Sequence, residues 1–366
     1  MRLLALSWRY LDHPAAGGAE QVTHEILRRL ARELDEVTSF TASYPGASVR
    51  DTIDGVKIVR GGRQATVHLH AWRWLRTRRE RYDLVVDQIN TIPFFTPLYV
   101  PASKRIFFIH QLAREYWWRE TRGAAKLVAP LGFIAEPGIM RIYRSSRGVT
   151  GSESTARDLT ALGIPRDRIT IVPYPISMQP VDSLEPKPNG LRVVVLGRLT
   201  PAKFVEEAIL AFAEIQRAVP EAALDVLGGG DDRYRARLER MVQGLSLSNV
   251  TFCGRVAEEQ KRGMLARAHV HLFTSHREGW GLVVSEAAAM GTPSVGYDVP
   301  GVRDSIGDQR LLVRSGDTIG LASRAKGLCR DPQFYAEVRQ AAWKRTLEMS
   351  PDAAAKGFAR ALGLEP

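Results

Sequence analysis

The chain has 366 residues and a formal net charge of +11, from 51 Lys and Arg against 40 Asp and Glu. Its composition, 45% hydrophobic and 25% charged, excludes a disordered protein, and no apolar run reaches the roughly 20 residues that cross a bilayer. The two cysteines, Cys253 and Cys329, lie far apart, which excludes a disulfide scaffold and a zinc knuckle. The short apolar start reaches Arg9 too soon for a signal peptide, so we expect a cytoplasmic enzyme of about two domains.

The first half begins with a predicted strand over residues 3–8. A turn at Gly17-Gly18 follows, and then a helix whose apolar stripe runs from Val22 to Leu34. Four more strands are expected in this half, at residues 83–87, 105–109, 148–151 and 170–172. The most basic stretch, residues 72–82, interleaves aromatic side chains with cations, which is typical of a basic surface helix or of a face for anionic membrane or nucleic acid.

The second half repeats this order with a predicted strand over residues 191–197 and a helix whose apolar stripe runs from Val205 to Ile215. Further strands are expected at residues 224–227, 250–252, 270–273 and 294–295. Solid apolar strands that alternate with amphipathic helices predict an α/β fold with two doubly wound parallel sheets. Five prolines between Pro173 and Pro188 favour a linker, because proline extends neither a helix nor a central strand.

The strongest local motif covers residues 275–293, between the predicted strand at 270–273 and a helix that begins near Leu282. Gly279 and Gly281 keep bulky side chains away from the turn, so backbone N–H groups at the helix start can face a phosphate. Glu278 lies just before the helix and Glu286 on its second turn, so two carboxylates can accept hydrogen bonds from different hydroxyl groups of one ligand.

This motif resembles the Glu-x7-Glu motif of the retaining glycosyltransferases with the GT-B architecture, and most resembles glycosyltransferase family 4. The resemblance implies two Rossmann-like domains that face a central cleft. Domain 1–178 would bind the acceptor, 179–190 would be the linker, and 191–345 would bind the nucleotide sugar. We expect the helical segment 346–366 to pack back on the first domain. The resemblance also implies that Glu278, with Gly279, Trp280, Gly281 and Leu282 beside it, contacts the donor sugar and that Glu286 binds the ribose.

A second motif, residues 197–203, lies between a predicted strand and a helix and carries Arg198 and Lys203. A guanidinium fork and a point charge on such a loop suit a diphosphate, and the family has an Arg and a Lys at this spacing. The family usually has glycine after the lysine, whereas this chain has Phe204.

In the first half, the family comparison gives roles to three further places. Gly17 and Gly18 match the glycine-rich turn that closes over the donor diphosphate, and a helix N-terminus there favours phosphate. His110, at the end of a predicted strand, matches a histidine at the reaction centre, where we expect it to position the sugar and acceptor. Tyr116 and Trp117, just beyond it, are candidates for acceptor binding.

Three glycine-containing loops in the second half carry weaker signals. Gly254 and Arg255 match the family's nucleobase region. Residues 228–231 lack the last glycine of the dinucleotide fingerprint, so we expect a tight turn near the nucleotide rather than NAD binding. Residues 300–304 resemble a family loop that binds phosphate, with proline and aspartate in place of the usual glycine and glutamate.

Together these motifs predict a retaining hexosyltransferase that uses a UDP- or GDP-linked sugar and an acceptor hydroxyl on a glycan, lipid or small natural product. We expect no metal, no other cofactor and no nucleic-acid partner, and we allow a peripheral contact with the inner face of an anionic membrane. Two alternatives remain open: a nucleotide-sugar epimerase on the same fold, and, more distantly, a basic binding module without enzymatic activity.

Overall fold

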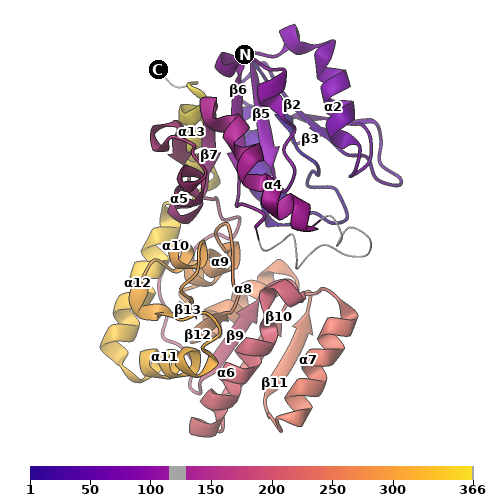
Figure 1. Cartoon of the computed structure of the whole chain (residues 1–366). Helices are drawn as coiled ribbons and strands as arrows, with labels where there is room; N and C mark the ends of the chain where they lie inside the picture. Colours follow the sequence, from indigo (N-terminus) through magenta and orange to yellow (C-terminus); the bar gives the residue numbers. More distant parts are fainter. Residues whose placement is uncertain (115–128, 365–366) are drawn as a thin grey trace. The chain divides into compact units, whose positions relative to one another are not determined.

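The computed structural model describes residues 1–114 and 129–364. These residues form two compact units (Figure 1). The first unit contains Met1–Pro175 and the C-terminal segment from Met349 onward, and the second unit contains Ile176–Glu348. Within the described residues, no helix is both long enough and apolar enough to cross a membrane.

The first unit is built on an eight-stranded sheet with the order β3-β4-β2-β1-β5-β6-β7-β8. Its strands are β1 (Arg2–Leu6), β2 (Glu36–Thr41), β3 (Arg50–Ile53), β4 (Val56–Arg60), β5 (Leu84–Ile89), β6 (Arg105–Ile109), β7 (Arg147–Thr150) and β8 (Ile169–Ile171). The β3–β4 pair is antiparallel, and the other pairings among these strands are parallel, with Leu3 of β1 opposite Val37 on one side and Leu84 on the other. Residues Leu3–Leu6 are buried, as expected for a strand covered on both faces.

Helices pack on this sheet. They are α1 (Gly18–Leu30), α2 (Val67–Arg76), α4 (Ala129–Ile142), α5 (Glu153–Ala161) and α13 (Pro351–Leu362). The buried stripe of α1 includes Val22, Ile26 and Leu30. The prediction that Leu34 continues this stripe is wrong, because the chain turns after Ala31 to enter β2 at Glu36.

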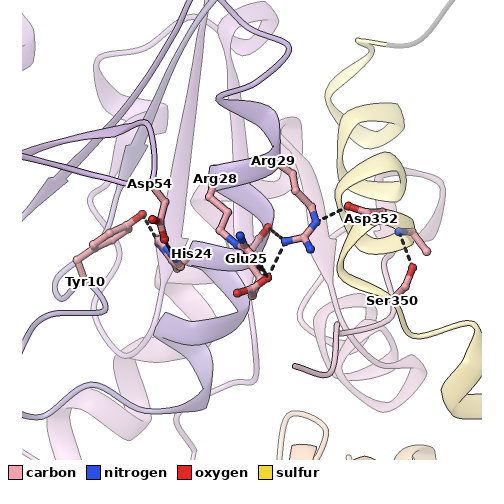
Figure 2. A network of polar contacts seen from close by, with 9 residues as sticks. Tyr10, His24, Glu25, Arg28, Arg29, Asp54, Ser350 and Asp352 are labelled. Atoms are coloured by element: carbon pink, nitrogen blue, oxygen red, sulfur yellow. Dashed lines mark hydrogen bonds and ion pairs between the residues drawn. The ribbon is translucent and has the colours of Figure 1, made fainter. Parts of the chain in front are cut away.

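The C-terminal helix α13 completes the first unit rather than the second. Ser350 caps its N-terminus by accepting a hydrogen bond from the Ala353 amide at 3.1 Å. Arg29 of α1 donates to Asp352 at 2.5 Å and to Glu25 at 2.6 Å, so one guanidinium joins the two helices (Figure 2). The apolar side of α13 is buried, and the ring of Phe358 lies 5.2 Å from that of Phe108 on β6.

The second unit is built on a six-stranded sheet with the order β11-β10-β9-β12-β13-β14, and its strand pairings are parallel. Its strands are β9 (Arg192–Leu196), β10 (Ala223–Leu227), β11 (Val250–Gly254), β12 (Val270–Phe273), β13 (Ser294–Tyr297) and β14 (Leu312–Val313). Its helices are α6 (Val205–Ala218), α7 (Asp232–Gly244), α8 (Glu258–Arg267), α9 (Leu282–Ala289), α10 (Val302–Ile306), α11 (Thr318–Arg330) and α12 (Pro332–Leu347). Val193, Ile209 and Leu272 are among the fully buried residues of its core.

The proline-rich segment before β9 lies along the second unit. The Val181 amide donates to the Ala289 carbonyl, and Lys187 donates to the Ala266 carbonyl and the Thr292 hydroxyl, both at 2.8 Å. Burial, and then the nearby Arg339 guanidinium, lower the pKa of Lys187 to about 7. This segment is therefore held in place by specific polar contacts.

Candidate functional site

The loop with Arg198 and Lys203 follows β9 and is supported by the glycine run after β10. A Cβ on Gly228 would lie 1.8 Å from the Gly197 carbonyl oxygen, so only glycine fits there. The Leu199 amide donates to the Gly229 carbonyl at 2.9 Å, and the Asp231 amide donates to the Leu199 carbonyl at 3.0 Å. The glycine run thus allows two backbones to approach closely and fixes the base of the cationic loop.

The two cations of this loop differ in their surroundings. Arg198 is exposed, whereas Lys203 ends a short 3-10 helix (Pro201–Lys203) and is largely buried. The Lys203 ammonium forms an ion pair with the Glu278 carboxylate, and the two side chains are 22% and 12% exposed. The two residues therefore lie in contact although 75 positions separate them in the sequence.

The segment 300–304 contacts the backbone of Glu278. The Glu278 amide donates to the Pro300 carbonyl at 3.2 Å. Gly301 has a φ of 79°, which favours glycine, and a Cβ on it would lie 2.0 Å from the Glu278 carbonyl oxygen. Both the backbone conformation and the lack of space therefore require glycine at this position. Asp304 accepts a hydrogen bond from the Gly301 amide at 3.0 Å and fixes the turn. This segment positions the backbone of Glu278.

The remaining residues of the motif form the turn into α9. Gly281 is the N-cap residue of the helix, Leu282 is its first residue, and Gly279 is buried beside them. The indole N–H of Trp280 donates to the Ser285 hydroxyl at 2.9 Å, so the ring is tied to the first turn of the helix.

Glu286 lies on the second turn of α9 and pairs with Lys261 of α8, 3.2 Å away. Burial raises the pKa of the Glu286 carboxyl, and Lys261 offsets only part of that effect. Burial alone would lower the pKa of Lys261, but the carboxylates of Glu286 and Glu258 outweigh it and raise the pKa. Sequence reasoning missed Lys261, because no spacing rule connects it to a partner 25 residues away.

Gly254 and Arg255 lie at the end of β11, on the same edge of the second sheet. Gly254 accepts a hydrogen bond from the Gly228 amide at 2.8 Å, and Arg255 is exposed next to it. This edge therefore carries a row of loops with Arg198, Lys203, Arg255 and Glu278.

His110 follows β6 in the first unit and is 8% exposed. Its Nδ1 lies 2.6 Å from the Tyr174 hydroxyl and its Nε2 lies 3.1 Å from the Gln88 side-chain amide. Burial lowers the pKa of His110 to about 3, so the ring is neutral near pH 7. This buried, neutral ring suits a role in which His110 positions a ligand or neighbouring residues. It does not suit a role as proton donor at neutral pH.

Gly17 and Gly18 begin α1, as predicted: Gly17 is the N-cap residue and Gly18 is the first residue of the helix. The Gly17 amide donates to the Glu20 carboxylate at 2.7 Å, and Arg9 pairs with the same carboxylate at 3.2 Å. The guanidinium of Arg9 also lies 4.1 Å from the centre of the Trp8 ring. Arg9 therefore adds a cation to this turn that the sequence did not single out.

The structure places the other predicted residues as follows. Tyr116 and Trp117 lie outside the described residues. The basic stretch 72–82 begins in the second half of α2, which ends at Arg76. Arg76 lies over Trp72 at 5.2 Å, and Arg78, beyond the helix, lies over Trp74 at 5.2 Å, so aromatic faces of the protein itself engage these two cations. Over residues 1–114 and 129–364, no three His, Cys, Asp or Glu side chains gather to hold a metal ion.

Comparisons with known proteins agree with this arrangement. Residues 16–179 match the family described as Glycosyltransferase Family 4, and residues 181–345 match Glycosyl transferases group 1. A D-inositol 3-phosphate glycosyltransferase of Acidothermus cellulolyticus is 27% identical over 91% of this chain and 84% of its own length. A glycogen synthase of Mycobacterium tuberculosis is 28% identical over 56% of this chain, which spans half the length of that relative.

Two solved structures extend the likeness to the fold. Sucrose-phosphate synthase of Thermosynechococcus elongatus is 18% identical, with a TM-score of 0.75 over 98% of this chain and 97% of that one. HepE of Anabaena, in complex with UDP and glucose, is 17% identical, with a TM-score of 0.72 over 99% of both chains. At these identities the likeness concerns the fold alone.

Proposed function

The chain belongs to the family 4 glycosyltransferases, with the GT-B fold of two parallel-sheet domains, and on that premise we propose that it transfers a hexosyl unit from a nucleotide sugar to an acceptor hydroxyl. The observation that carries the proposal is the contact between Lys203 and Glu278 on neighbouring loops of the second sheet. A cation for a phosphate and a carboxylate for sugar hydroxyls then lie within the reach of one small ligand.

In the proposed donor complex, the diphosphate lies on the loop after β9. Arg198 binds phosphate oxygens in a fork and Lys203 binds them as a point charge, so negative charge that develops on the leaving group is stabilised without a metal ion. Glu278 leaves Lys203 to accept hydrogen bonds from the donor sugar, and Glu286 accepts hydrogen bonds from the ribose. Gly279 to Leu282 supply amide groups at the start of α9.

We propose that the transfer retains the configuration at the anomeric carbon. The acceptor oxygen forms a bond to the anomeric carbon, and the bond between this carbon and the diphosphate oxygen breaks. Both events take place on the same face of the sugar. The acceptor's proton passes to the leaving phosphate, so no protein carboxylate has to act as a covalent nucleophile. His110, which is neutral, positions the sugar and the acceptor rather than donating a proton.

The acceptor is proposed to be a hydroxyl group on a glycan, a lipid or a small natural product, and the donor to be linked to UDP or GDP. The relatives agree with this range, since they include an inositol 3-phosphate glycosyltransferase and a GDP-mannose-dependent mannosyltransferase.

A ligand panel followed by product analysis tests the proposal. UDP, GDP, UDP-glucose, UDP-N-acetylglucosamine and GDP-mannose are screened by thermal unfolding, where a ligand at 100 times its Kd adds about 2.7 kcal/mol of stability. The stabilising donor is then incubated with candidate acceptors, and the anomeric configuration of the product is read by NMR. Conversion of donor to another sugar without acceptor would favour an epimerase, and the absence of binding by every nucleotide would refute the proposal.

A further inference from the structure

Phe204 has an unusual backbone and an unusual partner. It directly follows Lys203 and has a φ of 49°, in the left-handed region that costs a residue with a Cβ roughly 1–2 kcal/mol. Its ring stacks on His276, with a centroid separation of 3.9 Å and an interplanar angle of 26°. Both side chains are only partly buried, so this contact lies outside the fully buried core.

His276 is itself held on three further sides. Its Nε2 lies 3.0 Å and 3.1 Å from the two carboxylate oxygens of Glu207, on the first turn of α6. Its Nδ1 lies 3.2 Å from the Ser315 hydroxyl, and the buried ring of Tyr297 contacts its edge at 5.3 Å. The imidazole therefore has a fixed orientation, and its face toward Phe204 is fixed with it.

A third contact ties the same two loops together. The Thr274 hydroxyl donates to the Lys203 carbonyl at 3.0 Å. The backbone of Lys203 and the ring of the next residue, Phe204, thus both contact the loop between β12 and α9. Glu278 lies on that loop, two residues beyond His276.

From these contacts we propose that Phe204 and His276 form a positioning pair, which holds the ammonium of Lys203 and the carboxylate of Glu278 at the spacing needed for one donor molecule. This inference rests on the proposed function, because it concerns the same two side chains. Neither ring needs to touch the donor. The pair acts through the backbone of its neighbours, and the strained φ of Phe204 turns its ring onto the imidazole.

Phe204→Gly separates this role from a general effect on folding. Glycine adopts a φ of 49° without strain, so the loss of the ring is offset in part by the relief of strain, and the melting temperature should change little. Turnover should fall by about 10- to 100-fold, because small displacements of catalytic groups have effects of this size, while the affinity for UDP should change little. Phe204→Tyr keeps the stack and should restore most of the turnover.

His276 and a control complete the variant set. His276→Ala should lower turnover as Phe204→Gly does, and the double variant should be no worse than either alone, since both remove one contact. His276→Phe keeps a stacking face but loses Glu207, so its turnover should be intermediate. Phe334→Ala is the matched control, because Phe334 is also a partly buried aromatic residue of the second unit and lies on α12 beside Arg310.

A measurement without substrate keeps the inference separate from the proposed function. In protein labelled with 5-fluorotryptophan, the Trp280 resonance, assigned by its loss in Trp280→Phe, reports the order of the loop that carries Glu278. It should shift or broaden in Phe204→Gly and His276→Ala and stay unchanged in Phe334→Ala. If wild-type protein turns over no donor, the proposed function fails. The Trp280 resonance then decides by itself whether Phe204 and His276 order the loop. An unmoved resonance, an unchanged turnover in Phe204→Gly, or an equal loss in Phe334→Ala would overturn the positioning role.

Discussion

The candidate residues at the carboxyl edges of the two sheets differ in their chemistry. In the second unit, charged side chains are paired with one another and stay partly exposed, as with Lys203 and Glu278 or Lys261 and Glu286. In the first unit, the candidate residue His110 is buried and neutral among the aromatic rings of Phe108 and Tyr174. Ion pairs of this kind can exchange partners when a charged ligand arrives, whereas a packed neutral ring keeps one geometry.

This difference suggests a division of labour. Under the proposed function, the second edge would supply the electrostatic work of binding and stabilising a diphosphate, and the first edge would supply a rigid surface for the acceptor. Four predictions test or refine that contrast.

The largest effect on turnover is expected from the charged residues of the second unit. Lys203→Ala should lower turnover by about 10³-fold, because in the proposed complex the ammonium stabilises charge that develops on the leaving diphosphate. Glu278→Gln should lower turnover by about 10³-fold as well, because it removes the carboxylate that is proposed to orient the donor sugar. Steady-state kinetics measure the loss, and circular dichroism controls for folding. Near-normal turnover in both variants would contradict the assignment of electrostatic work to this edge.

The next effect tests whether the first edge depends on packing. Phe358 of α13 is fully buried and contacts Phe108, which in turn packs at 4.5 Å against His110. Phe358→Ala should therefore lower the free energy of unfolding by about 3 kcal/mol. Urea unfolding measures this change, with Asp352→Asn as an exposed control on the same helix that should cost well under about 1 kcal/mol. Equal losses in the two variants would show that the buried ring is not what anchors α13.

A smaller effect concerns titration at the second edge. Removing the cation in Lys261→Met should raise the pKa of Glu286 further, since burial already favours its neutral form. In the proposed complex ribose hydroxyls donate to the ionised carboxylate, so the acid limb of nucleotide binding should move to higher pH, with affinity about tenfold weaker near pH 6. Calorimetric titration with UDP or GDP from pH 5 to 8 measures the shift. Glu258→Gln, which leaves Lys261 in place, should move the limb far less.

The smallest effect is expected at His110, whose protonation state should stay constant near neutral pH. Because the pKa of His110 is lowered to about 3, its ring resonances should not move between pH 5 and 8. The unfolded chain takes up a proton at this residue below about pH 6.5, so His110 lowers the stability of the fold as the pH falls from about 6.5 toward 3. NMR of the imidazole follows the titration, and a midpoint near 6.5 in the native protein would contradict the neutral, packed state.

Much of the fold follows from local sequence patterns, and the failures have physical reasons. The solid apolar strands β1, β6 and β9 were predicted within a few residues. β2 was missed because polar Thr and Ser residues fill a strand that is buried all the same, and β4 was missed although Val56 and Ile58 alternate with more exposed residues. The Asp54-Gly55 turn, with positive φ at both residues, is a hairpin signal that would have revealed β3 and β4 together.

The candidate site divides in the same way. The motif spacing predicted the places of Glu278, Glu286, Arg198 and Lys203 on loops and on the start of a helix. Two contacts of candidate residues could not be predicted. Lys261, the partner of Glu286, and Tyr174, the partner of His110, each come from a distant segment through the packing of whole elements. The left-handed backbone of Phe204 had one signal, the glycine that the family usually has at this position, because glycine is the usual residue in that conformation.

The return of α13 to the first unit has a consequence for biosynthesis. Domains generally fold as they leave the ribosome, with those nearest the N-terminus first. Here residues 176–348 complete the second unit while the first still lacks α13 and the ring of Phe358 that covers Phe108. The unit that is translated first is therefore the last to be finished. Until α13 is added, the ring of Phe108 lacks the contact that Phe358 makes with it in the finished unit.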